Sequence, residues 1–124
     1  MSIRGAYRRK TSRPQGPGIP REDSEGEATL ALHLRARKID FEREVCLIPE
    51  RRWRWDFVIP AAKITIEVHG AIWNRGAHAR GGGLERDYAK MNAAVLAGYR
   101  PLQYSTQMVI EGDAIYDIME ALRG

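Results

Sequence analysis

Two short segments of alternating side chains constrain the fold of this chain more than any other feature. Apolar and polar residues alternate in 52–59 and again in 64–69, which is typical of strands with one buried face. Because the connection between them is short, the segments predict an antiparallel hairpin with Ile59 opposite Ile64. One face of this hairpin is apolar and is expected in the core: Trp55, Phe57, Ile59, Ile64, Ile66 and Val68.

The other face of the hairpin places two acids together. In this register Asp56 falls opposite Glu67, and Arg54 falls opposite His69. Directly opposed side chains have Cβ atoms about 4.5–5.5 Å apart, and like charges in that position are destabilising. Two such carboxylates require a shared proton, a basic neighbour or a cation. Since Mg²⁺ prefers carboxylate oxygens, the pair predicts a divalent-metal site, with neutralisation by Arg54 or another arginine as the alternative.

Helices and further strands are predicted around the hairpin. Ser24, followed three residues later by Glu27, indicates a capping box at the start of a helix over 24–38. Glu27 also lies on the apolar stripe of this helix, where it either serves as a cap or has a function. The remaining patterns predict a strand over 42–48, a helix over 84–97 with an apolar face (Leu84, Tyr88, Met91 and Val95), a strand over 99–104 and a helix over 113–123.

The order of these elements predicts an α/β fold. The strand over 64–69, the helix over 84–97 and the next strand form a β-α-β crossover, so these two strands are expected to be parallel. A length of 124 residues favours one domain. We therefore expect a small mixed sheet flanked by helices, with a helix at the C-terminal end.

Charge is distributed unevenly along the chain. Residues 1–21 contain six basic residues and no acid, whereas 22–124 contain 14 basic and 16 acidic residues. This predicts a disordered basic arm over 1–23 and a folded domain over 24–124. Such an arm either holds nucleic-acid phosphates or is a solvated tail.

Composition excludes several classes of protein. No apolar run approaches the roughly 20 residues of a membrane span, and no signal peptide is visible. The single cysteine, Cys46, excludes an internal disulfide and a multi-cysteine zinc site. The expected setting is the reducing cytoplasm.

The hairpin and the residues around it resemble a known family. Asp56, followed after ten residues by Glu67-Val68-His69, resembles the core of the PD-(D/E)XK nuclease superfamily, which has a restriction-endonuclease-like α-β-β-β-α-β order. The stretches 55–60 and 66–70, with the loop of Gly, Arg and His after them, are similar to the very-short-patch-repair-like branch and to small phage-encoded endonucleases. The resemblance covers about residues 24–109.

The resemblance implies roles for individual residues. Asp56 and Glu67 would bind Mg²⁺ or Mn²⁺ with the carbonyl of Val68, and Glu27 matches an additional acid on the first helix. His69 occupies the position of the family's lysine. Either His69 itself or Lys90, on the following helix, would supply the cation.

The implied activity is divalent-metal-dependent DNA endonuclease, acting on mismatched or branched DNA in phage replication, repair or recombination, in the host cytoplasm. Symmetric cutting of both strands would require a homodimer. A non-catalytic DNA-binding protein on the same fold is the alternative, whereas a His-Asn-His centre of His69, Asn74 and His78 is too compact. The expected DNA contacts are Arg54, Arg75, His78, Arg80, Arg86 and Gln103.

Overall fold

The computed structural model describes residues 24–70 and 82–123, with side chains from residue 85 onward in the second segment. Its sheet has four strands in the order β1-β2-β3-β4; β1, β2 and β3 are antiparallel, and β4 runs parallel to β3. This mixed sheet with flanking helices and a C-terminal helix confirms the predicted fold class. The elements are α2 (Glu25–Ala36), β1 (Glu42–Val45), β2 (Trp55–Ile59), the 3-10 turn η1 (Pro60–Ala62), β3 (Ile64–His69), α4 (Gly82–Leu96), β4 (Arg100–Ser105), α5 (Thr106–Ile110) and α6 (Asp113–Arg123).

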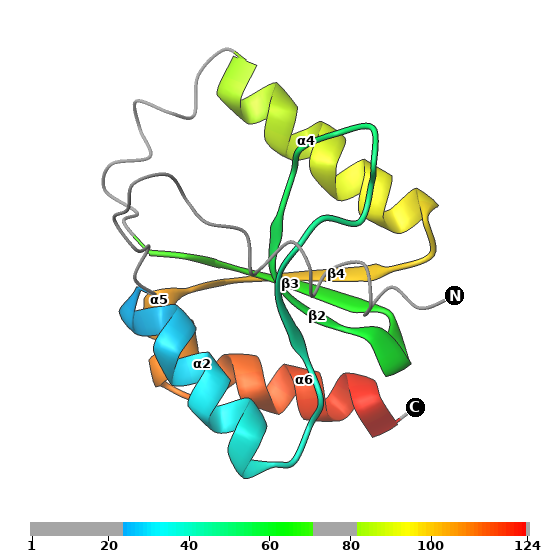
Figure 1. The fold of residues 1–124 in the computed structure, drawn as a ribbon. Helices are drawn as coiled ribbons and strands as arrows, with labels where there is room; N and C mark the ends of the chain where they lie inside the picture. The colour runs from blue at the N-terminus through cyan, green and yellow to red at the C-terminus, as the bar shows by residue number, and fades with distance from the viewer. Residues whose placement is uncertain (1–23, 71–81, 124) are drawn as a thin grey trace, which may run out of the picture.

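Helices cover both faces of the sheet. Figure 1 shows α2, α5 and α6 on one side and α4 on the other. Between the sheet and the first group of helices lies the larger core, which includes Leu30, Leu34, Phe57, Ile64, Ile66, Val109 and Ile118. The smaller core, on the α4 side, contains Val45, Trp55, Val58, Ala94 and Tyr99.

The predicted hairpin is confirmed, and its register is confirmed for residues 57–59 of β2 against 64–66 of β3. Phe57 pairs with Ile66, Val58 with Thr65 and Ile59 with Ile64. The turn is closed by the Lys63 N–H, which donates to the Pro60 carbonyl oxygen at 3.2 Å. The predicted parallel pairing of the crossover is also confirmed, and it places Glu67 beside Gln103.

The predicted face of Trp55 is wrong. Its ring is buried in the smaller core with Val58, while Phe57 belongs to the larger core on the opposite face. The regular alternation therefore breaks between Trp55 and Phe57. At this point the neighbouring strand carries Glu44 in the left-handed region, at φ 52°, which a regular strand does not contain.

The predicted inner face of the helix over 84–97 is also wrong. Tyr88 is 58% exposed and Val95 is 52% exposed, whereas Ala94 is fully buried. The side chain of Leu84 lies outside the described residues. Lys90 lies on the inner side instead, with Asp87 lining the same cavity. Tyr88 and Val95 therefore lie on the solvent side, whereas Met91 is half-buried and the Lys90 ammonium reaches the Arg54 carbonyl.

Other differences concern the limits of elements. The predicted strand over 42–48 ends at Val45, and the short helix α5 was not predicted, although Ser105 caps it by accepting the Met108 N–H at 3.1 Å. The predicted cap of α2 is confirmed, since Ser24 Oγ accepts the Glu27 N–H at 3.2 Å. The predicted arm over 1–23 lies outside the described residues. No helix in the described part of the chain has the length and apolar character needed to cross a membrane.

Gly26 permits a close approach of α2 to the rest of the fold. A Cβ atom at this position would lie 2.7 Å from Thr106 Oγ1 and 2.8 Å from Val68 Cγ1. Both distances are shorter than van der Waals contact. The absence of a side chain therefore sets the position of the first turn of α2, which carries Glu27, against α5 and β3.

We predict that Gly26→Ala lowers the free energy of unfolding by about 1–3 kcal/mol, the usual effect of overpacking. The direction is informative because alanine is otherwise about 1 kcal/mol more favourable than glycine inside a helix. Urea denaturation measures the change, with Ala28→Gly, at an exposed position of the same turn, as the propensity control. A stabilised Gly26→Ala variant would contradict the close approach.

Candidate active site

Asp56 is fixed at the end of the β2–β3 pairing. Its Oδ2 accepts the backbone N–H of Val68 at 2.8 Å. Burial raises the pKa of the Asp56 carboxyl above its ordinary value; the Val68 bond opposes this rise, Glu67 adds to it by charge repulsion, and Lys90 and Arg43 oppose it. The ionised form of Asp56 is thus held in an environment that disfavours it, and Glu67 lies near enough to contribute.

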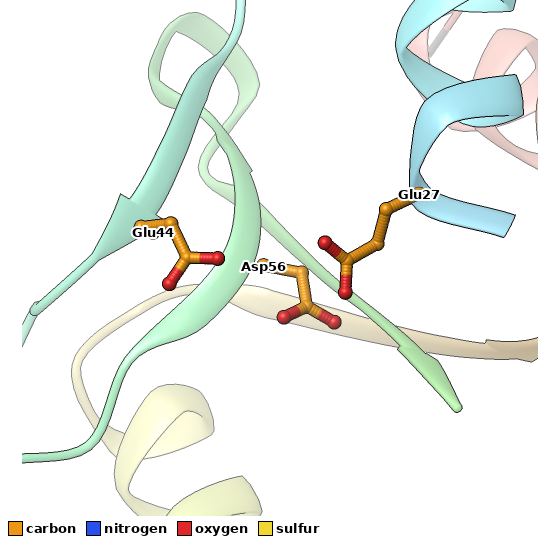
Figure 2. A group of neighbouring side chains, drawn as sticks. All are labelled: Glu27, Glu44 and Asp56. Carbon is orange, nitrogen blue, oxygen red and sulfur yellow. The ribbon is translucent and has the colours of Figure 1, made fainter. Parts of the chain in front are cut away.

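Three carboxylates converge on one point at the edge of the sheet. Glu27 from α2, Glu44 from β1 and Asp56 from β2 have oxygen atoms within 4.8 Å of one another. Figure 2 shows the Glu27 and Glu44 carboxylates approaching Asp56 from opposite sides. Glu27 therefore belongs to the acidic group. Its backbone N–H donates to the Ser24 side chain, which caps the N-terminus of α2.

Sequence reasoning missed Glu44. The pairs Arg43–Phe57 and Val45–Trp55 flank it, so Glu44 lies at the level of Asp56. The signal in the sequence is that Glu44 follows Glu42 by two residues in a predicted strand, which places both acids on the same face. The long connection over 46–54 leaves the register of that strand undetermined, so the sequence does not show which β2 residue Glu44 meets.

Arg43 partly neutralises the acidic group. Its Nη2 lies 2.9 Å from Glu27 Oε1, and its Nε donates to the Asp56 carbonyl oxygen at 3.2 Å. The guanidinium also lies 4.3 Å from the centroid of the Phe57 ring. The alternative of neutralisation by an arginine concerned Asp56 and Glu67. Arg43 pairs instead with Glu27 and has a smaller effect on Asp56, and Glu67 pairs with Lys90. Arg54 lies 3.8 Å from Glu44.

Lys90 reaches the sheet from α4. Its ammonium forms an ion pair with Glu67 and donates to the Arg54 carbonyl oxygen at 2.7 Å. It also lies 5.0 Å from the centroid of the Trp55 ring. Of the two cations that the sequence offered, Lys90 is the one that contacts the Glu67 carboxylate.

His69 has a different partner. Its Nε2 lies 3.3 Å from Gln103 Oε1. These residues, with Lys90 and Glu67, line a small cavity of about 40 Å³ between α4 and the sheet. The parallel β3–β4 pairing thus brings Gln103 to the site, as the sequence allowed.

The other predicted DNA contacts are only partly described. Arg54 and Arg86 are exposed, Arg54 before β2 and Arg86 on α4. Arg75, His78 and Arg80 lie outside the described residues, as does Asn74 of the alternative centre. Two of the predicted arginines are therefore on the surface of the described structure.

The residues present fit a divalent cation. The acidic group offers carboxylate oxygens, the donor type that Mg²⁺ and Mn²⁺ prefer. The raised pKa of Asp56 shows that its charge lacks full compensation from the protein's own groups. A divalent cation among these oxygens would supply that compensation.

Comparison with known proteins supports the fold. No protein-family model matches the chain, and no curated protein matches its sequence. Its structure is similar to a solved one described as the catalytic domain of the homing endonuclease I-Bth0305I, with a TM-score of 0.59 and 18% sequence identity. The similarity covers 79% of this chain and 92% of that domain. At this identity the comparison shows a nuclease-like fold.

We predict that Asp56→Asn stabilises the metal-free protein at pH 7, by about 0.5–2 kcal/mol. The substitution removes a carboxylate whose ionised form is disfavoured, and the amide oxygen still accepts the Val68 N–H. Because the native pKa is raised, the wild type recovers stability as acid protonates Asp56, so the difference should shrink from pH 7 toward pH 4.

Urea denaturation in EDTA across this pH range measures the difference. Glu50→Gln, at an exposed position in the β1–β2 connection, is the control for loss of one carboxylate and should change stability little at either pH. An Asp56→Asn protein that is less stable than wild type at pH 7 would show that the charge is well compensated.

Proposed function

We propose that the chain is a divalent-metal-dependent DNA endonuclease of the PD-(D/E)XK type. The observation that carries this proposal is the convergence of Asp56, Glu67 and Lys90 at one end of the sheet. These are the two acids and the cation that the family resemblance requires. The likeness to a homing endonuclease catalytic domain supports the proposal of a nuclease, since it shows a nuclease-like fold.

The proposed metal ligands are Asp56 and Glu67 with the Val68 carbonyl, and Glu27 is the additional acid. Asp56 and Glu27 belong to a group of carboxylates with oxygen atoms within 4.8 Å of one another, and Glu27 also pairs with Arg43. Glu67 lies near enough to raise the pKa of the Asp56 carboxyl, and it pairs with Lys90. A bound Mg²⁺ or Mn²⁺ would polarise the scissile phosphate and lower the pKa of an attacking water. The Val68 N–H donates to Asp56 Oδ2, so Oδ1 of Asp56 would be the oxygen that holds the metal ion.

Lys90 is the proposed electrostatic stabiliser. Its ammonium is fixed by the Arg54 carbonyl and by the Trp55 ring, so it does not need to reorganise as the reaction proceeds. From this position it would stabilise negative charge that develops on the phosphate oxygens. His69 contacts Gln103, and these two side chains would contact the DNA strand.

The proposed substrate is mismatched or branched DNA, in keeping with the very-short-patch-repair-like resemblance. Arg54 and Arg86 are exposed on the α4 side of the sheet and would contact phosphates. Arg75, His78 and Arg80, which lie outside the described residues, complete the proposed set of DNA contacts. Symmetric cleavage of both strands would again require a second copy of the chain.

A cleavage assay tests the proposed function. The full chain, with Mg²⁺, Mn²⁺ or EDTA, is incubated with single-stranded, duplex, mismatched, flapped and four-way-junction DNA. We expect cleavage that requires the metal ion and is abolished by Asp56→Ala and by Glu67→Gln. Glu120→Gln, whose side chain is 50% exposed on α6, is the matched control and should cleave normally. Binding without cleavage by the wild type would favour the non-catalytic alternative.

A second comparison separates the two candidate cations. We expect Lys90→Gln to lower kcat by about 10²–10³, the loss usual for one stabilising donor. We expect His69→Ala to lower it less than tenfold, because Lys90 pairs with the Glu67 carboxylate, whereas His69 Nε2 contacts Gln103. Thermal unfolding verifies that both variants fold. The reverse order of the two losses would assign the cation to His69.

A further inference from the structure

A basic groove lies between the end of α2 and the edge strand β1. It has a volume of about 520 Å³ and carries three cationic side chains against one acid. None of its cations is among the DNA contacts proposed above. The residues that line it are Arg35, Lys38, Ile39, Asp40, Phe41 and Arg43.

Aromatic rings support the two guanidinium groups of this groove. The Arg35 guanidinium carbon lies 5.5 Å from the centroid of Phe41, and that of Arg43 lies 4.3 Å from the centroid of Phe57. The two rings are themselves in contact, with centroids 5.5 Å apart. A guanidinium stacked over a ring can still donate through the N–H groups at its periphery, which suit phosphate oxygens. Two nitrogens of Arg43 already contact Glu27 and the Asp56 carbonyl, so Arg35 is the guanidinium of the groove relevant to phosphate binding.

Lys38 occupies a backbone position that normally favours glycine. Its φ is 60°, and it ends α2 in a Schellman motif: the Lys38 N–H donates to Arg35 and the Ile39 N–H to Leu34. A non-glycine residue in the left-handed region costs about 1–2 kcal/mol. Glycine at this position would avoid the conformational cost but would lack the ammonium group. The lysine therefore adds a positive charge to the groove in exchange for that cost.

The groove is continuous with the candidate active site. Arg43 contributes to both, since it lines the groove and also contacts Glu27 and the Asp56 carbonyl. Arg35 follows Glu27 by eight residues on α2, which corresponds to about 12 Å at 1.5 Å per residue. One DNA strand presents a phosphate about every 3.4 Å of helix axis, so this distance spans about three to four nucleotides.

We propose that this groove binds the DNA backbone on one side of the cleaved bond, with Arg35 and Lys38 each contacting a phosphate. The proposal rests on the proposed function, because it takes the acidic group as the place where the scissile phosphate lies. Asp40 is the opposing charge within the groove. Its negative charge weakens the attraction of the groove for phosphates. Removing that charge should therefore have the opposite effect on DNA binding from removing Arg35 or Lys38.

The salt dependence of DNA binding tests the proposal. Binding of a 30-base-pair duplex is measured in EDTA over a range of NaCl concentrations, with Asp56→Asn in every protein to prevent cleavage. Each lost phosphate contact reduces the slope of log affinity against log salt by about 0.9. We therefore expect Arg35→Gln and Lys38→Gln each to reduce the slope by about 0.9, and the double variant by about 1.8. Asp40→Asn should tighten binding.

The control is Arg123→Gln, which removes one positive charge from an exposed position at the end of α6. Its slope should remain that of the parent protein. Equal slopes for the Arg35, Lys38 and Arg123 variants would overturn the groove as a DNA site while leaving the proposed function intact. A parent protein that binds no DNA at any salt concentration would overturn both. A reduced slope with a cleavage-inactive wild type would support the groove and reject the endonuclease.

Discussion

The antiparallel pairing of β2 with β3 is the constraint on which the rest of the structure depends. These strands form the centre of the sheet, so β1 and β4 join only at their outer edges. Beyond the last paired residues, Phe57 and Ile66, the Val68 N–H donates to the Asp56 carboxylate. A register shift of one residue would exchange the faces of every side chain on the shifted strand, and the acids would no longer meet.

Main-chain carbonyls of Asp56 in β2 and of Arg54 just before β2 hold the two cations that balance this site. Arg43 donates to the carbonyl of Asp56 and binds Glu27, whereas Lys90 donates to the carbonyl of Arg54 and binds Glu67. Each cation thus connects one acid to a fixed main-chain oxygen. Asp56 itself is held by a neutral N–H, and its carboxyl pKa is raised. Incomplete compensation of this kind is a cost to folding that a functional site commonly carries.

Local sequence patterns predicted the features that depend on neighbouring residues. The hairpin register follows from alternation and a short turn, and the Ser24 cap follows from spacing. The errors arise where a distant segment decides the outcome. Trp55 faces α4 because regular alternation ends beside Glu44, and the inner side of α4 was misassigned because Lys90 occupies it. The proximity of Asp56 and Glu67 and the candidate cation Lys90 were predictable from sequence, whereas the position of Arg43 was not.

The two faces of the sheet differ in how much apolar burial supports them. In the described part of the chain, the buried core beneath α2, α5 and α6 has twelve residues and the one beneath α4 has five. Segments with less apolar burial open locally at lower free energy than the whole molecule unfolds. Amide hydrogens of α4 should therefore exchange with solvent faster than those of α2. Since α4 carries Lys90, each such opening would dismantle the Glu67 ion pair while the larger core stays folded.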